Sequence, residues 1–341
     1  MKIQCICLIA LLLVYAPWAA AAPKTDIVIL TNGDRVTGEI KRLEAGLLEL
    51  DTDYMGTLKI EWLHISRIFS QQNLAVETTD GRRVTGRLQK ETTGDELIVT
   101  TAGGVVDLAP EDIVEVWPVA ATFLDKSTLD LSVGIDYAKS TEIGNYNLAV
   151  DFNHTSIDRY TDASLRSSIT RQSDGAEQSR QEVRFSHNYM RPEKRFRTWL
   201  GGVESNDALD LNLRASGGYA FGKFLVKSNV SWFYLIAGLV ATEERYTGEG
   251  DTVSLEALGQ ARYRYFRYDS PKRSVDTTLT VLPSLTESGR IRSNLRTTFK
   301  LELVKDLFWS LEFYASHDTN PPREGVEKTD YGITSALGYS F

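Results

Sequence analysis

The sequence has very little cysteine, because only Cys5 and Cys7 occur among its 341 residues. Both lie in an N-terminal segment that we expect to be removed, so the mature chain has no thiol. This excludes disulfides, thiolate metal sites and cysteine nucleophiles. No second long apolar run follows that segment, which argues against a helical membrane protein. Basic charge is not in excess either: 38 Lys and Arg face 46 Asp and Glu, a net charge of −8, which argues against nucleic-acid binding.

Residues 1–21 have the three-part pattern of a secretory signal peptide. Met1-Lys2 gives a short basic start, Ile3 to Ala16 is almost wholly apolar, and Ala19–Ala22 supplies small residues before a proline. Cleavage after Ala21 fits this spacing best. The alternative is an uncleaved anchor helix, which is disfavoured because the apolar core is short for a membrane span. We therefore expect an exported protein.

Residues 22–120 contain an internal repeat. The segments 31–40 and 79–88 share the pattern Gly-x-Arg-Val-Thr-Gly, displaced by 48 residues. Asn-Gly and Asp-Gly precede the shared pattern and are typical of hairpin turns, since both residue types tolerate positive φ. Repetition at this period indicates duplicated supersecondary units. We expect a β-rich domain of two repeats, at about 25–72 and 73–118, that form small β-barrel modules of the SH3 or Sm type.

The role of this domain stays open between a periplasmic spacer and a module that binds a partner protein or peptidoglycan. His64 is its only histidine and has no His, Asp or Glu partner at a usable metal spacing in the sequence. We therefore expect His64 to be an ordinary surface or core residue, and we predict neither a metal site nor a cofactor.

Residues 128–341 alternate with a period of two. In the last segment the apolar side chains fall on one parity and small or polar ones on the other, which places them on opposite faces of a strand. About twelve such runs begin near residues 128, 145, 161, 179, 195, 210, 228, 253, 274, 290, 307 and 330. Their length fits transmembrane strands of about 9–11 residues plus loops. The sequence predicts an all-β protein whose C-terminal part is an antiparallel transmembrane β-barrel of about twelve strands.

The connections between these runs alternate in length. Short turns are expected at residues 192–194, 221–224, 270–273 and 305–306, and longer acidic connections at 173–178, 204–210, 243–251 and 317–330. Outer-membrane barrels place short turns in the periplasm and long loops outside. This order follows if the N-terminal domain lies in the periplasm and the first strand leads outward.

The signal peptide, the duplicated repeats, the barrel and the terminal Phe341 together resemble the family of salt-induced outer membrane proteins, which is of unknown function. The resemblance implies a bacterial outer membrane location, contact with its lipids and lipopolysaccharide, and a link to osmotic or salt conditions. It also implies that Tyr339 and Phe341 are the C-terminal signal read by the barrel-assembly machinery. It supplies no catalytic residue.

The parity that faces the lumen carries several cationic side chains. The lumen-lining candidates are Arg184, Arg214, Arg262, Arg264, Arg296 and Lys300. They are consistent with a narrow solute channel whose charged rings select its solute. They are also consistent with a small barrel whose interior is filled by paired opposite charges, as in an envelope-stabilising protein. Both interpretations stay open.

An enzyme is not predicted, although one pair of residues offers an alternative. His154 and Ser156 share one strand face and could act as base and nucleophile of a lipid hydrolase. The pair resembles that of outer membrane phospholipase A, but the Asn-Gly-Arg that follows it there is replaced by Ile157-Asp158-Arg159. His154 also falls near the periplasmic end of its strand. The other alternative is a protein that tethers a periplasmic partner.

Overall fold

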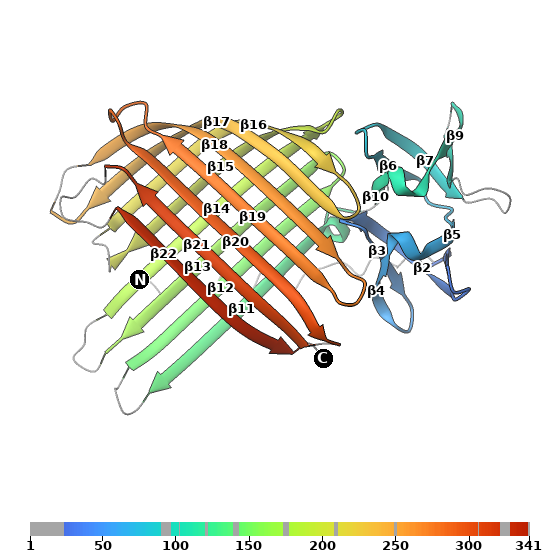
Figure 1. Ribbon diagram of the computed structural model, residues 1–341, viewed down its shortest axis with the longest axis horizontal. Coiled ribbons are helices and arrows are strands. Elements are labelled where there is room, and N and C mark those ends of the chain that lie inside the picture. The colour runs from blue at the N-terminus through green and yellow to red at the C-terminus, as the bar shows by residue number, and fades with distance from the viewer. Residues whose placement is uncertain are drawn as a thin grey trace.

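The computed structural model describes residues 24–89, 97–101, 103–119, 122–138, 143–172, 177–207, 211–248, 251–305, 307–320 and 328–339. These residues form two antiparallel β-sheets, one of ten strands and one of twelve (Figure 1). The predicted signal peptide with its two cysteines, and Phe341, lie outside the described residues. Among the described residues, no helix has the length and apolar character needed to cross a membrane.

The ten-stranded sheet shows the repeat directly. Its strands are β1 (Asp26–Leu30), β2 (Arg35–Glu44), β3 (Leu47–Thr52), β4 (Gly56–Glu61), β5 (Ile65–Phe69), β6 (Leu74–Thr78), β7 (Arg83–Gln89), β8 (Leu97–Thr101), β9 (Gly104–Leu108) and β10 (Ile113–Pro118). A 3-10 turn precedes the last strand of each repeat, η1 (Trp62–His64) before β5 and η2 (Pro110–Asp112) before β10. The second set of elements therefore repeats the first at the 48-residue displacement of the sequence motif.

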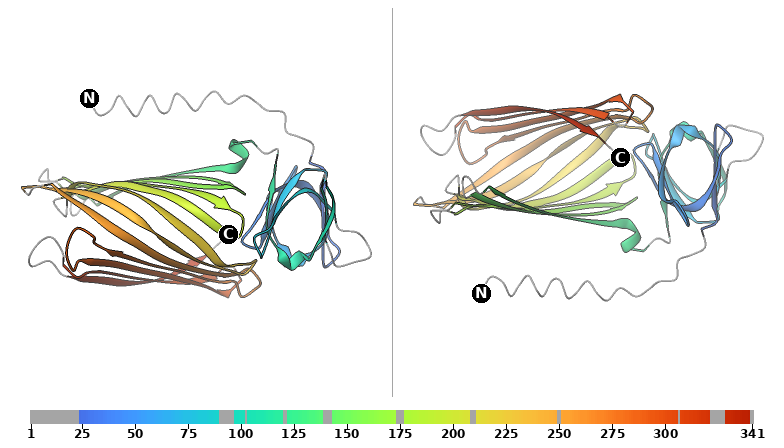
Figure 2. Two further views of the ribbon diagram at one scale, coloured as in Figure 1. Left: turned by 90° about the horizontal axis from the view of Figure 1, so that it is seen from above. Right: turned by 90° about the horizontal axis from the view of Figure 1, so that it is seen from below.

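The two repeats do not form two separate SH3- or Sm-like modules. Strand β5 of the first repeat pairs with β7 of the second, and β10 of the second pairs with β2 of the first. With the pairings inside each repeat, these contacts run in a closed circuit β1-β5-β7-β6-β10-β2-β1, visible as an oval ring in Figure 2. One shared core fills it, and the fully buried members include Val28, Ile40 and Ile113. The prediction of separate modules is wrong because the repeats exchange their edges.

The twelve-stranded sheet follows chain order, with each strand antiparallel to the next. After a short 3-10 turn, η3 (Leu124–Lys126), its strands are β11 (Ser127–Ala138), β12 (Ile143–Ser156), β13 (Arg159–Arg171), β14 (Glu177–Arg191), β15 (Arg195–Asn206), β16 (Leu211–Lys227), β17 (Ser231–Tyr246), β18 (Thr252–Arg267), β19 (Arg273–Pro283), β20 (Ile291–Val304), β21 (Leu307–Asp318) and β22 (Thr329–Tyr339). The predicted count of twelve antiparallel strands is confirmed. Period-two alternation was a sufficient signal because one face of each strand is apolar and outward.

One predicted turn is wrong. Residues 221–224 lie inside β16, and the chain reverses at residues 228–230 instead. Gly222 is not a turn residue: a Cβ there would collide with the ring of Phe196 on β15, so glycine makes room for an inward aromatic side chain. Phe224 is buried while Phe221 is exposed, which is the in-and-out alternation of a strand.

The twelve-stranded sheet keeps two free edges. Among the described residues, β11 pairs with β12 and β22 with β21, and β11 and β22 do not pair with each other. The closed barrel predicted from the sequence is therefore not what these residues show. Both edge strands expose apolar rows, with exposed fractions of 58–73% for Leu129, Leu131, Val133 and Ile135.

The ten-stranded sheet lies against one end of the twelve-stranded sheet (Figures 1 and 2). It touches the turns at residues 192–194, 228–230 and 268–272, which join β14 to β15, β16 to β17 and β18 to β19. All three are short connections. The N-terminal domain thus lies at the end where the sequence places the short turns.

Candidate functional site

The inner face of the twelve-stranded sheet encloses a cavity of about 750 Å³. Even-numbered side chains of β13 to β20 form most of its lining, because alternate residues of a strand point to the same face. Four of the predicted lumen-lining residues contribute to its wall: Arg184, Arg214, Arg262 and Arg264. Arg296 and Lys300 lie on β20, outside this wall.

Most of the predicted lumen-lining cations are matched by carboxylates. Arg214 Nε lies 2.7 Å from Glu244, and its Nη1 lies 3.1 Å from Glu204. Arg262 and Arg264 share Asp276, at 2.7 and 3.4 Å. The remaining predicted cations have these partners: Arg184 contacts Glu182, Arg296 lies 3.7 Å from Glu312, and Lys300 lies 4.3 Å from the ring centre of Phe308. The interior is therefore a network of opposite charges.

The buried carboxylate Glu256 belongs to the same network and was missed by the sequence reasoning. It is 1% exposed and accepts a hydrogen bond of 2.8 Å from Arg292 Nε. The two residues are 36 positions apart and lie on β18 and β20. Only the register of the intervening strand brings them together, so no local sequence signal could identify the pair.

An aromatic layer lies at the end of the cavity that faces the N-terminal domain. Phe196, Phe224, Trp232 and Phe266 are buried together. Ring centres of Phe196 and Phe224 are 5.5 Å apart, and those of Trp232 and Phe266 are 5.9 Å apart. Ala45 of the N-terminal domain packs against this layer.

The turn between β2 and β3 carries Ala45 into this position. Ala45 has φ 50° and Gly46 has φ 76°, and a Cβ on Gly46 would collide with the backbone oxygen of Asn229. Glu44 beside them lines the cavity together with Glu115 of β10. Burial raises the pKa of Glu44, and the nearby Glu115 raises it further. The N-terminal domain thus supplies both an apolar contact and acidic side chains at the mouth of the cavity.

A buried cation joins the two sheets. Lys227, at the end of β16, is 5% exposed, and its Nζ lies 2.8 Å from Glu77 and 2.8 Å from Glu115. Arg83 lies 2.7 Å from the other oxygen of Glu77. Burial raises the pKa of Glu115. Beside this group, the side-chain amide of Asn229 donates to the backbone oxygen of Ile113 at 2.8 Å.

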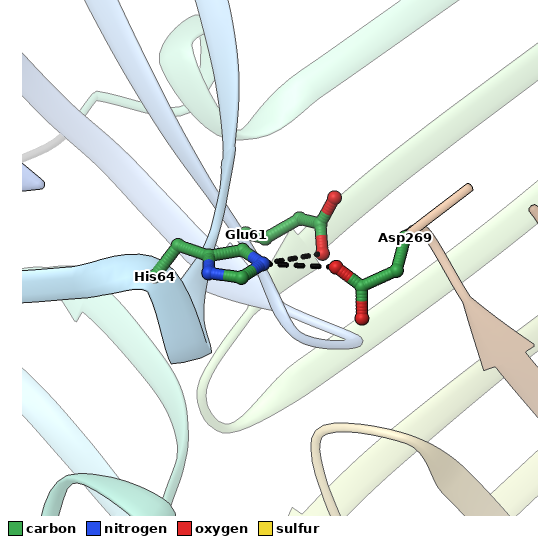
Figure 3. A group of neighbouring side chains, drawn as sticks. All are labelled: Glu61, His64 and Asp269. Atoms are coloured by element: carbon green, nitrogen blue, oxygen red, sulfur yellow. Dashed lines mark hydrogen bonds and ion pairs between the residues drawn. The ribbon is translucent and has the colours of Figure 1, made fainter. Parts of the chain in front are cut away.

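A second polar contact between the sheets involves His64 (Figure 3). Its Nε2 lies 2.9 Å from Asp269 Oδ1, in the turn between β18 and β19, and 3.7 Å from Glu61 Oε2. The fold brings Asp269 to His64 across 205 residues of sequence, a contact that the sequence spacing did not indicate. The hydrogen bond with Asp269 raises the pKa of His64 and lowers that of Asp269. Burial raises the pKa of Glu61, and repulsion from Asp269 adds to that effect.

The predicted hydrolase pair is not brought together. His154 Nδ1 lies 2.9 Å from Ser127 Oγ, and the ring of His154 stacks on Phe123 at 4.5 Å. Ser156 Oγ donates instead to Asp158 Oδ1 at 2.8 Å. Both residues lie at the end of β12 that faces the N-terminal domain. Of the predicted assembly signal, Tyr339 ends β22.

A family model matches residues 131–341, and its description reads "Protein of unknown function, DUF481". The match covers the twelve-stranded sheet almost from end to end and more than half of the chain. No curated protein and no solved structure matches the chain. The chain therefore belongs to the DUF481 family.

Proposed function

We propose that this member of the DUF481 family is an outer-membrane β-barrel protein that forms a narrow solute channel, which its own N-terminal domain keeps shut at the periplasmic end. The observation that carries the proposal is the turn between β2 and β3, which rests on the aromatic layer at the mouth of a charge-lined cavity. A cavity with so many charged groups holds water more readily than apolar solutes. In this proposal the N-terminal domain controls access to the cavity.

The twelve-stranded sheet closes into a cylinder in the membrane in this proposal. Free strand edges and outward apolar rows are unfavourable in water. In hydrocarbon, unpaired backbone groups are more costly still, so spanning strands form closed barrels. Pairing of β11 with β22 would remove both edges, and lipid would cover the apolar rows of Leu131, Ile135 and Ile333.

The orientation follows from the turns. Short turns lie on the periplasmic side of outer-membrane barrels, so the N-terminal domain would be periplasmic and the long connections external. Outer-membrane lipids and lipopolysaccharide would surround the barrel, and the barrel-assembly machinery would insert it. Binding of a periplasmic protein or peptidoglycan by the N-terminal domain, and a response to salt, extend the same proposal.

Beside the apolar contact of Ala45, several contacts between the domain and the barrel are polar, which supports a reversible closure. Ion pairs and hydrogen bonds of Lys227, Asn229 and His64 join the two parts. Interfaces of this polar kind resemble those of transient complexes, and relative motion of the parts is the ordinary expectation for them.

Single-channel recording on the full chain in planar bilayers tests the channel. We expect long closed periods with brief openings in the unmodified protein, and a higher open probability in Lys227→Met, which loses the buried link between the two parts. Lys223→Met, an exposed site on the same strand, should behave as the unmodified protein. If both variants stay electrically silent, the channel is refuted, and the charge network supports an envelope-stabilising barrel instead.

A further inference from the structure

Glu61, His64 and Asp269 are placed as metal ligands are. One possible ligand atom from each lies within 4.8 Å of the others, and in the described part of the chain no other three His, Asp or Glu side chains meet this condition. Figure 3 shows the two carboxylates directed at the same ring nitrogen of His64. The residues come from both parts of the molecule, two from the N-terminal domain and one from the β18–β19 turn.

We propose that Glu61, His64 and Asp269 bind a divalent transition-metal ion of the zinc class, which clamps the N-terminal domain to the β18–β19 turn. One imidazole nitrogen and two carboxylate oxygens are ligands that Zn²⁺ accepts, whereas Ca²⁺ and Mg²⁺ favour oxygen ligands alone. In tetrahedral coordination three protein ligands leave one position for water. The exposed fractions of the side chains of His64 and Asp269, 53% and 44%, give that water access.

The backbone that carries Glu61 and His64 is rigid. Glu61 directly precedes η1 and His64 is its last residue, and Glu61 Oε2 lies 3.7 Å from His64 Nε2. Trp62 between them is buried, and its Nε1 donates to the backbone oxygen of Pro110 at 2.6 Å. The backbone oxygen of His64 accepts a hydrogen bond of 2.9 Å from Thr31. The pair is therefore preorganised by contacts that do not involve a ligand.

Asp269 is oriented from its other side. Its Oδ2 lies 3.4 Å from Arg267 Nε, which leaves Oδ1 directed at His64. Arg267 neutralises part of the charge of this carboxylate but lies on the oxygen away from the site. Lys272 is the other cation whose field reaches Glu61.

The second repeat provides an internal comparison. Its equivalent turn, η2, has the same backbone contact, from Thr79 to the oxygen of Asp112 at 2.7 Å. Yet Ala109 and Asp112 stand there at the positions equivalent to Glu61 and His64. The Glu-x-x-His pair thus occurs only in the repeat that faces Asp269. The shape of the turn does not require these side chains, which favours a role at the interface.

Zinc titration of the full chain, purified in detergent and stripped with a chelator, tests the site by isothermal calorimetry. We expect saturable binding of one Zn²⁺ per chain that excess Mg²⁺ does not displace. His64→Gln and Asp269→Asn should each weaken binding at least about tenfold, because the loss of even an outer-shell partner of a ligand costs about 10–100-fold. Asp269→His should restore it, because imidazole replaces the carboxylate as a ligand. His317→Gln, an exposed histidine bonded to Thr329, is the matched control and should bind as the unmodified chain does.

The metal acts as a clamp only if binding needs ligands from both the N-terminal domain and the β18–β19 turn. If Asp269→Asn binds zinc as tightly as the unmodified chain, or if no saturable binding is found, the proposal is overturned. Melting curves without metal should be alike for all variants, which separates loss of a ligand from loss of the fold. Binding does not depend on conduction, so a chain that binds zinc but never conducts would refute the channel alone.

Discussion

Replacement of Lys227 by methionine should release the N-terminal domain from the end of the twelve-stranded sheet. Lys227 is 5% exposed and contacts two carboxylates, so its removal leaves buried negative charge without a partner. Removing one member of a buried ion pair costs about 3–5 kcal/mol. Arg83 still compensates Glu77, so we expect the lower end of that range, about 3 kcal/mol in the docking equilibrium. This corresponds to a roughly hundredfold larger undocked fraction, at about 1.4 kcal/mol per factor of ten.

Thiol labelling can measure this fraction, because the mature chain is predicted to contain no cysteine. Ala45→Cys places a thiol against the aromatic layer, where it reacts only after undocking. Tyr54→Cys, at a site 99% exposed, gives the intrinsic reactivity under the same conditions. The ratio of the two rates should rise about a hundredfold in Lys227→Met and stay unchanged in Lys223→Met. Equal ratios in both variants would show that the buried ion pairs do not hold the domain.

The pH dependence of the same experiment has a defined sign. Burial raises the pKa of Glu115, so its charged form is disfavoured in the docked state. In Lys227→Met, the charge of Glu115 therefore opposes docking. This cost to docking is absent below the ordinary carboxylate pKa, where Glu115 is neutral in both states. It grows as the pH rises toward the raised pKa of the docked state and reaches its full value above that pKa. The excess labelling of Lys227→Met over Lys223→Met should therefore shrink as the pH falls. An excess that grows on acidification would contradict the assignment to Glu115.

Two further substitutions test the interface and the hydrolase alternative. Gly46→Ala places a Cβ against the backbone of Asn229 and should undock the domain. Gly33→Ala is the control, because Gly33 also has a positive φ but open space around it. It should cost only the backbone strain of about 1–2 kcal/mol. Thiol labelling of Ala45→Cys distinguishes them, and equal labelling would count against the close approach at Gly46. Ser156→Ala should release as much fatty acid from phospholipid as the unmodified chain does, since Ser156 bonds to Asp158 and not to His154; a loss of release would revive the hydrolase.

The strands were predictable because each one carries its own signal. Alternation along β22 or β20 is a local pattern, and its cause, one outward apolar face, acts on every strand alike. The turn expected at residues 221–224 failed for a physical reason: glycine there relieves contact with Phe196 and does not bend the chain. A glycine between aromatic residues can either form a turn or make room for a side chain of the neighbouring strand. The sequence of its own strand does not distinguish these two roles.

The site was not predictable to the same degree, because its members meet across strands and between the two sheets. The register of β18, β19 and β20 brings Arg292 into contact with Glu256. The packing of one sheet against the other brings His64 into contact with Asp269. Of the cations that parity selected, Arg184, Arg214, Arg262 and Arg264 line the cavity. Parity could not say that each would have a partner there, because partners depend on registers that alternation does not specify.

The exchange of edges between the two repeats has a consequence for the ancestry of the N-terminal domain. In a single repeat, two strands lack a partner at one edge. A second copy supplies both partners, and the two pairings, β5 with β7 and β10 with β2, are related by an approximate two-fold axis. Two identical polypeptides could therefore build the same ring as one fused gene. Fusion fixes the stoichiometry and frees the halves to diverge, which is why one 3-10 turn can carry Glu61 and His64 while its twin keeps Ala109 and Asp112. The duplication thus allowed the two repeats to differ, so that only one of the two 3-10 turns carries the residues that contact Asp269.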